Sequence, residues 1–203
     1  ERTKYMVSGN YFRQNGVVKN NDMDRFTARI NLDQQINKKV KMGVNLTLSK
    51  ITTDNVPLGS GQNENAGIMV AASQFNPLLP VRDEDGNYVL NQQAAFLPNP
   101  VSLLEISDKS TKERLLGTTY VEYRPIKDLL LKANLGFDRN YQRRENYLPK
   151  TTLYGAKKNG QATIGQYDKT DYLIELTANY TKTLGLHNIN ALAGYSFQRF
   201  TDK

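Results

Sequence analysis

Two neighbouring stretches decide the fold: residues 25–33 read RFTARINLD, and residues 40–49 read VKMGVNLTLS. In the first stretch, Phe26, Ala28 and Ile30 alternate with polar residues such as Arg25 and Arg29. Successive side chains of a β-strand point to opposite faces of the sheet. Each stretch therefore predicts a strand with one apolar face and one polar face.

The same alternation recurs along the 203 residues of the chain. It predicts seven strands, over residues 4–14, 22–36, 39–53, 111–125, 128–143, 163–182 and 187–200. Strands of soluble proteins usually have about five or six residues, whereas a tilted strand that crosses a bilayer needs about 9–11. The length of these strands therefore favours a membrane-spanning sheet.

The connections between the predicted strands are short and long in turn. The short ones lie near residues 36–39, 125–128 and 183–186, and the long ones near 15–21, 52–110 and 140–162. Short periplasmic turns and longer extracellular loops are typical of outer-membrane barrels. We therefore predict an all-β fold, an antiparallel up-and-down transmembrane β-barrel segment. Bacterial single-chain barrels have even strand numbers, so seven strands predict a fragment of a larger barrel.

The long loop at about 52–110 is predicted to be extracellular and to contain short helices. Asn63 or Asn65 is a candidate cap for the first helix, because asparagine favours that position. Helical spacing places four apolar residues on one face, which makes them candidate contacts for another part of the structure: Ile68, Met69, Ala72 and Phe75. Asp85-Gly86 predicts a hairpin turn between residues 79–81 and 88–90.

Composition excludes several classes of function. There is no cysteine and only one histidine, so we expect no metal site and no cofactor. No nucleophile, base or paired carboxylates form a catalytic pattern, so we expect no enzyme. The net charge is +7, but basic residues occur as isolated pairs, so we expect no nucleic-acid partner. No apolar run approaches the roughly 18 residues of a transmembrane helix.

Several stretches, in this order and spacing, resemble the barrel of SusC/RagA-type TonB-linked outer-membrane transporters. They are YMVSGNYF (5–12), NGVV (15–18), RFTARINLD (25–33), NPLLPV (76–81), DGNY (85–88), NPV (99–101), YVEY (120–123) and LKANLG (131–136). The resemblance implies a 22-stranded barrel in outer-membrane lipid, with a plug domain inside. It also implies energised uptake of oligosaccharide or peptide nutrients and a SusD-like surface lipoprotein as partner. The contact with TonB would lie in an N-terminal part outside these residues.

The resemblance gives the polar face a role as the wall of the barrel lumen. The candidate lumen-facing residues are Arg25, Arg29, Asn31, Lys132, Asn134 and Glu175. The loop helix would contact the plug, a neighbouring loop or the lipoprotein. Two other hypotheses remain open at this point: a soluble β-sandwich that binds carbohydrate or another ligand, and a passive porin without plug or energy coupling.

Overall fold

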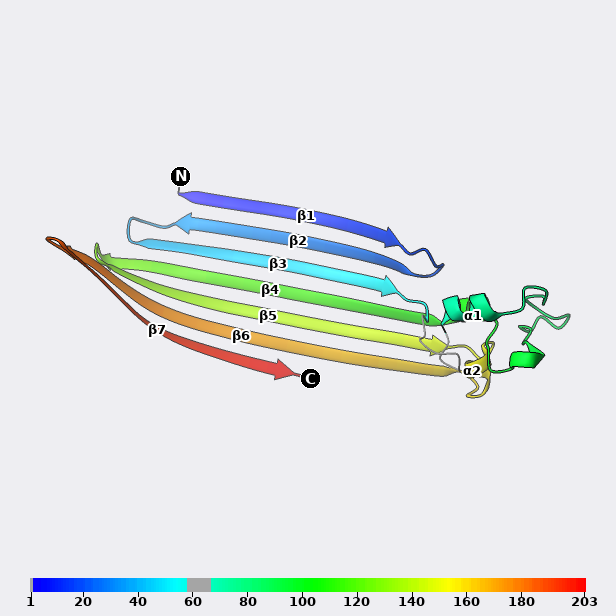
Figure 1. The fold of residues 1–203 in the computed structure, drawn as a ribbon. Coiled ribbons are helices and arrows are strands. Elements are labelled where there is room, and N and C mark those ends of the chain that lie inside the picture. Colours follow the sequence, from blue (N-terminus) through cyan, green and yellow to red (C-terminus); the bar gives the residue numbers. More distant parts are fainter. Residues whose placement is uncertain (1, 58–66) are drawn as a thin grey trace.

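The computed structural model describes residues 2–57 and 67–203, which form one antiparallel sheet with loops gathered at one end (Figure 1). The seven strands lie side by side in sequence order. They are β1 (Thr3–Asn15), β2 (Asp22–Gln35), β3 (Val40–Asp54), β4 (Ser107–Ile126), β5 (Leu129–Leu148), β6 (Gln161–Leu184) and β7 (His187–Asp202). This arrangement confirms the predicted all-β, up-and-down fold class.

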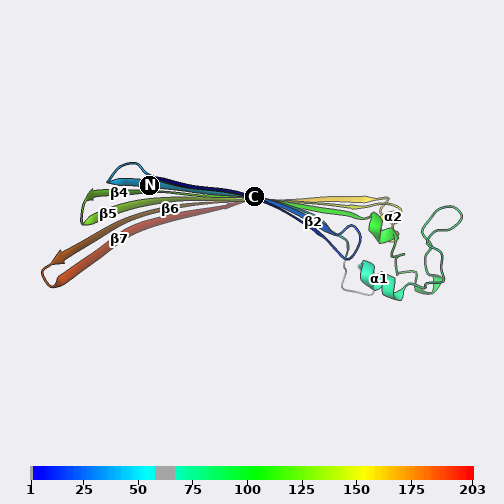
Figure 2. The ribbon, with the colours of Figure 1, turned by 90° about the horizontal axis from the view of Figure 1, so that it is seen from above.

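The short and long connections lie at opposite ends of the sheet. We call the end with residues 36–39, 127–128 and 185–186 the turn end, and the end with residues 16–21, 55–106 and 149–160 the loop end. The loop segments carry all the helical elements and extend away from the sheet (Figure 2). They are α1 (Ile68–Gln74), η1 (Gln92–Ala94), η2 (Ser102–Glu105) and α2 (Leu153–Ala156).

Two strands reach further toward the loop end than the alternation indicates. β4 begins at Ser107, four residues before the expected Thr111, and β5 ends at Leu148, five residues after the expected Arg143. In this extension the Arg144 guanidinium donates two hydrogen bonds to Asp108, at 2.9 and 2.5 Å. In this extension the side chains that pair between β4 and β5 are polar. The alternation of apolar residues therefore predicts both strands too short.

The register places the apolar residues of all strands on one face. Ile30 lies opposite Leu46, Leu46 opposite Gly117, Gly117 opposite Phe137, and Phe137 opposite Tyr172. Directly opposed residues of antiparallel strands share a face. Within residues 2–57 and 67–203 no second sheet covers this apolar face, because all seven strands belong to one sheet. The β-sandwich hypothesis is therefore wrong.

The buried apolar core lies in the loops instead of the sheet. It consists of Val56, Ile68, Ala71, Leu97, Leu103 and Ile106. Helix α1 turns Ile68 and Ala71 into this core, and Phe75 packs against it. Met69 and Ala72, the other two candidate contact residues, are exposed. Contact with the core follows a spacing of three and then four residues, from Ile68 to Ala71 to Phe75.

Two further loop predictions have different outcomes. The turn at Asp85-Gly86 is confirmed: Asp83 and Asn87 bond through their backbones at 2.9 Å, and Arg82 pairs with Tyr88. Gly86 has φ +83°, a left-handed conformation that glycine adopts without strain. Gly67 occupies the N-cap of α1 without a side-chain hydrogen bond. The candidate caps Asn63 and Asn65 lie outside the described residues.

Candidate functional site

The apolar residues form a band that shifts along the strands from β1 to β7. In β1 the band runs from Tyr5 to Tyr11, and in β7 it runs from Ile189 to Phe197. Following the paired residues from Tyr11 across the sheet leads to Lys203, which is six residues beyond Phe197. Following them from Tyr5 leads to Phe197, which is eight residues beyond Ile189.

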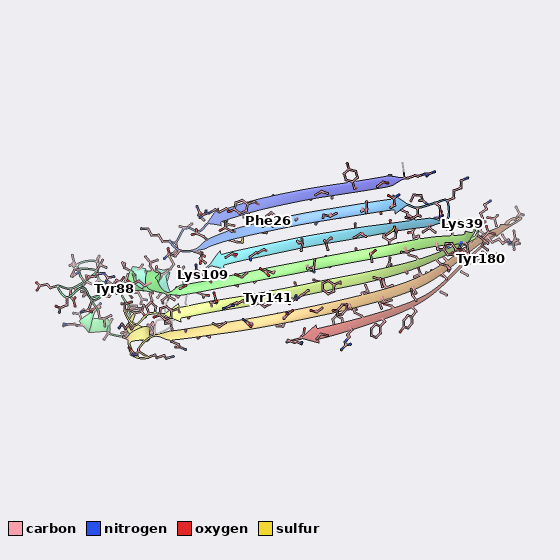
Figure 3. The ribbon with its side chains drawn as sticks, turned by 180° about the vertical axis from the view of Figure 1, so that it is seen from behind. Phe26, Lys39, Tyr88, Lys109, Tyr141 and Tyr180 are labelled. Atoms are coloured by element: carbon pink, nitrogen blue, oxygen red, sulfur yellow. The ribbon has the colours of Figure 1, made fainter. Side chains whose placement is uncertain are left out.

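Tilted strands require a shift of this size if the apolar band is to stay parallel to the membrane plane. Neighbouring strands lie about 4.8 Å apart, residues rise about 3.4 Å, and barrel strands tilt by about 35–45°. A line parallel to the membrane then crosses β7 about six to eight residues away from the residue that pairing across the sheet would reach from β1. Aromatic side chains mark both limits of the band: Figure 3 shows Phe26 and Tyr141 toward the loop end and Tyr180 toward the turn end. Aromatic girdles of transmembrane barrels occupy such positions.

Among the described residues, no helix has the length and apolar character needed to cross a bilayer.

The polar face carries all six residues predicted to face the lumen: Arg25, Arg29, Asn31, Lys132, Asn134 and Glu175. The structure brings only some of them together. The Asn134 amide donates to Glu175 at 3.3 Å, and Lys132 is the next residue of β5 on the same face. Arg25 lies near the loop end of β2, and Arg29 lies at the middle of that strand. The predicted set is therefore spread along the polar face.

The turn half of the polar face contains a cluster that we call the Tyr120 network. Its members are Asp33, Lys41, Tyr120, Glu122 and Lys132. The Tyr120 hydroxyl donates to Asp33, and the Tyr120 ring has the ammonium groups of Lys41 and Lys132 at 5.3 and 4.9 Å. Ion pairs join Lys41 to Asp33 at 4.0 Å and Lys132 to Glu122 at 3.4 Å. Every charged group of this network thus has a partner inside it.

Gly43 explains how Tyr120 can lie flat across the sheet. The two residues are directly opposed, and a Cβ on Gly43 would lie only 2.2 Å from Tyr120 Cε1. A tyrosine that covers a glycine on the neighbouring strand compensates for the missing side chain. Sequence reasoning missed Tyr120 and Asp33. The only available signal was a glycine inside an otherwise regular strand, which indicates a close approach.

The loop half of the polar face contains an open hollow of about 590 Å³, which we call the loop-side basin. Four cationic residues line it: Arg25, Lys112, Arg114 and Lys169. Neutral polar and apolar side chains complete it, including Thr27, Ser49, Ile51, Leu116, Asn140, Gln142 and Tyr167. Sequence reasoning found Arg25 and missed the others, because strands far apart in the sequence contribute them.

The cations of the basin differ in their partners. Arg114 makes a bidentate pair with Asp138, at 3.0 and 2.7 Å, and Lys169 lies 3.5 Å from Asp171. The Arg25 guanidinium lies 5.2 Å above the Phe12 ring and, within the described part of the chain, makes no ion pair. Lys112 likewise has no carboxylate within 4.0 Å among those residues. The basin therefore offers two uncompensated positive charges.

A second polar cluster joins two loops of the loop end to each other. Glu105 accepts hydrogen bonds from the Tyr88 hydroxyl at 2.5 Å, from Arg82 at 3.0 Å and from the Thr151 hydroxyl. The hydrogen bonds from Thr151 and Tyr88 lower the pKa of Glu105 below its usual value. Because Thr151 belongs to the loop between β5 and β6, this cluster joins that loop to the longer loop between β3 and β4.

Across residues 2–57 and 67–203, no three histidine, cysteine, aspartate or glutamate residues are arranged to hold a metal ion.

An open antiparallel sheet with a level apolar band on one face and polar residues on the other defines a segment of a transmembrane β-barrel. The comparisons with known proteins agree. The chain is 33% identical over 202 residues to the TonB-dependent receptor P3 of Formosa agariphila, covering 98% of this chain and 20% of that receptor. It is 28% identical over 205 residues to the TonB-dependent receptor P26 of the same organism. No family model matches.

Solved structures show the same fold. The RagAB peptide transporter superimposes with a TM-score of 0.75 at 21% identity, over 98% of this chain and 23% of that one. The closed form of the ferric-catecholate import receptor Fiu of E. coli superimposes with a TM-score of 0.52 at 10% identity, over 99% and 28%.

The chain is thus similar over 98% of its length to a TonB-dependent receptor, and it spans about a fifth of the receptors that it matches. It is a segment of a β-barrel of the outer membrane. These relatives are receptors rather than enzymes, which confirms the prediction that the chain has no catalytic role.

Proposed function

We propose that this chain forms part of the wall and mouth of a TonB-energised importer of oligosaccharide or peptide nutrients. The main support is the relationship to a TonB-dependent receptor, which extends over 98% of the chain rather than over one motif. The level apolar band adds physical support, because it fits a wall that is surrounded by lipid. In this proposal the chain supplies the scaffold, and other parts of the protein supply the plug and the contact with TonB.

The proposal assigns the polar face to the interior of the barrel. Arg25, Arg29 and Lys132 project from that face, and a charge held in hydrocarbon is costly. The opposite face exposes large apolar side chains such as Val7 and Ile30, with 70% and 44% of their surface accessible. Lipid covers such a face favourably, whereas water does not. We therefore place Asn31, Asn134 and Glu175 in the lumen as well.

The loop end is the proposed contact for a surface lipoprotein. Several large apolar side chains are exposed there: Met69 at 59%, Leu78 at 90% and Phe96 at 54%. Exposed apolar residues on a folded loop that hydrogen bonds hold in place are typical of protein contact sites. The Glu105 cluster would hold the two loops in place before the partner arrives, which lowers the entropy cost of binding. Met69 and Ala72 of α1 point outward and are available to the partner, whereas Ile68 and Phe75 pack inward.

The experiment is to isolate the full-length protein from outer membranes in mild detergent and to measure uptake with and without TonB. We expect a species several-fold heavier than 23.0 kDa, accompanied by a lipoprotein, and uptake that stops when TonB is deleted. Uptake that continues without TonB would favour the passive porin instead. A lone 23.0 kDa species in the soluble fraction would contradict both membrane hypotheses.

A further inference from the structure

We propose that the loop-side basin binds the carboxylate groups of the molecule that is imported. This inference rests on the proposed function, because it assumes that the polar face lines the lumen. It adds the chemical class of the substrate, which the relatives do not provide.

The first argument is the charge of the basin. All four ionic side chains that reach it from the polar face are cationic: Arg25, Lys112, Arg114 and Lys169. Glu113 also borders the hollow, but it belongs to the opposite face, where it pairs with Lys50 at 2.8 Å. Arg25 and Lys112 project from that polar face without a carboxylate partner among the described residues. They therefore remain available for an anion that comes from outside the chain.

The second argument is the neighbourhood of the two free cations. Arg29 lies on the same face as Arg25, four residues further along β2. It has no ion pair within the described residues either. Three uncompensated cations that face an enclosed lumen raise the local concentration of anions, because the protein walls exclude part of the screening solvent. On an open surface the same residues would be hydrated and largely screened.

The third argument is the mixed lining of the basin. Asn140, Gln142 and Thr27 present hydrogen-bonding groups, and Ile51 and Leu116 present apolar surface. Ligand sites combine apolar surface with a few polar groups that fix orientation. An acidic sugar has hydroxyls, an apolar ring face and a carboxylate. An acidic peptide has backbone N–H and C=O groups, apolar methylene groups and carboxylates. Both kinds of oligomer therefore fit the shared chemistry of the basin.

The fourth argument is position. The basin lies in the loop half of the polar face, between the extracellular loops and the Tyr120 network. A molecule that enters from outside meets the basin before it meets the network. In the network the charges already neutralise one another, so the two free cations of the basin are the first uncompensated charges on this wall.

The test uses the purified full-length receptor and two matched pairs of probes, with binding measured by calorimetry. One pair is a galacturonate oligomer and its methyl ester, and the other is a glutamate-rich hexapeptide and its glutamine counterpart. In at least one pair we expect the anionic probe to bind about tenfold more tightly than its neutral counterpart, which corresponds to about 1.4 kcal/mol. Increasing the salt concentration should reduce that difference.

The decisive variant is the double substitution Arg25→Gln and Lys112→Gln. We expect it to remove the preference for the anionic probe and to leave the neutral probe unaffected. Lys50→Gln is the control on the opposite face, because it removes one positive charge at a similar height, where the charge is paired with Glu113. It should leave the preference unchanged.

Three outcomes would overturn the inference. One is equal binding within both pairs, and another is no binding of either anionic probe. The third is a double variant that keeps the preference but destabilises the receptor, since the two cations would then be pairing with carboxylates of another part of the protein. TonB-dependent uptake of a neutral probe alongside any of these outcomes would leave the proposed importer intact, whereas a loss of all TonB-dependent uptake would count against the importer itself.

Discussion

Both halves of the polar face carry charged residues but use them differently. In the turn half, ion pairs join Lys41 to Asp33 and Lys132 to Glu122 around the Tyr120 ring. In the loop half, Arg25 and Lys112 have no carboxylate partner among the described residues. Charges that satisfy one another stabilise a wall, whereas charges left open are available to a ligand. The same strands therefore stabilise the wall in the turn half and offer charges to a ligand in the loop half.

The comparison assumes that both halves lie inside the barrel, and the largest expected effect tests this assumption. Leu46→Arg places a charge in the middle of the apolar band of β3. We expect a loss of about 2–4 kcal/mol of folding free energy in lipid if the site is near the midplane. Asn45→Arg, on the neighbouring residue and the opposite face, should be tolerated. Denaturant titration of the full-length protein in vesicles measures both, and equal effects would contradict the assigned faces.

The next effect tests how rigid the turn half is. Gly43→Val inserts a side chain where Tyr120 lies, and a Cβ alone would come within 2.2 Å of that ring. Overpacking of this kind costs about 1–3 kcal/mol. The same titration measures the loss. Gly165→Val is the control, because no atom lies within 4 Å of a Cβ at that position. A similar small loss for both variants would mean that Tyr120 moves aside freely.

A smaller effect isolates the hydrogen bond at the centre of the network. Tyr120→Phe keeps the ring between Lys41 and Lys132 but removes the hydroxyl that binds Asp33. We expect a loss of about 0.5–1.5 kcal/mol in the unfolding free energy. Tyr123→Phe, on the same strand but on the apolar face, is the comparison variant. If the two variants lose equal stability, the Asp33 contact contributes nothing particular.

The smallest effect is expected in the loop half. Arg25→Gln combined with Lys112→Gln should change the unfolding free energy by less than about 1 kcal/mol, because Arg25 contacts only the exposed Phe12 ring and Lys112 makes no ion pair among the described residues. Denaturant titration of the protein without ligand is the measurement. A loss above 1 kcal/mol would remove the contrast between the halves, since it would show that the basin cations also have partners inside the protein.

The sequence predicts the strands well because their apolar residues alternate without interruption, as Phe26 to Leu32 illustrate. It fails where polar contacts extend a strand, as Asp108 and Arg144 do at the loop end of β4 and β5. It identifies Arg25 as a polar-face residue, because that property depends only on local alternation. It cannot place Lys112 level with Arg25 on the same face, because they lie 87 residues apart in the sequence. Only the register aligns them, through Ile51 on the strand between.

The length of β5 has a consequence for how any partner reaches the loops. Beyond Phe137 the apolar face of β5 carries Arg139 and the aromatic Tyr141 at the limit of the band, and the strand continues to Leu148. Eleven further residues on a strand tilted by about 40° raise the loops about 29 Å above Phe137. A partner attached to the membrane by a lipid would therefore need a tether of about eight extended residues before its folded domain could meet the loops. The height of the wall thus sets a minimum linker length in the partner.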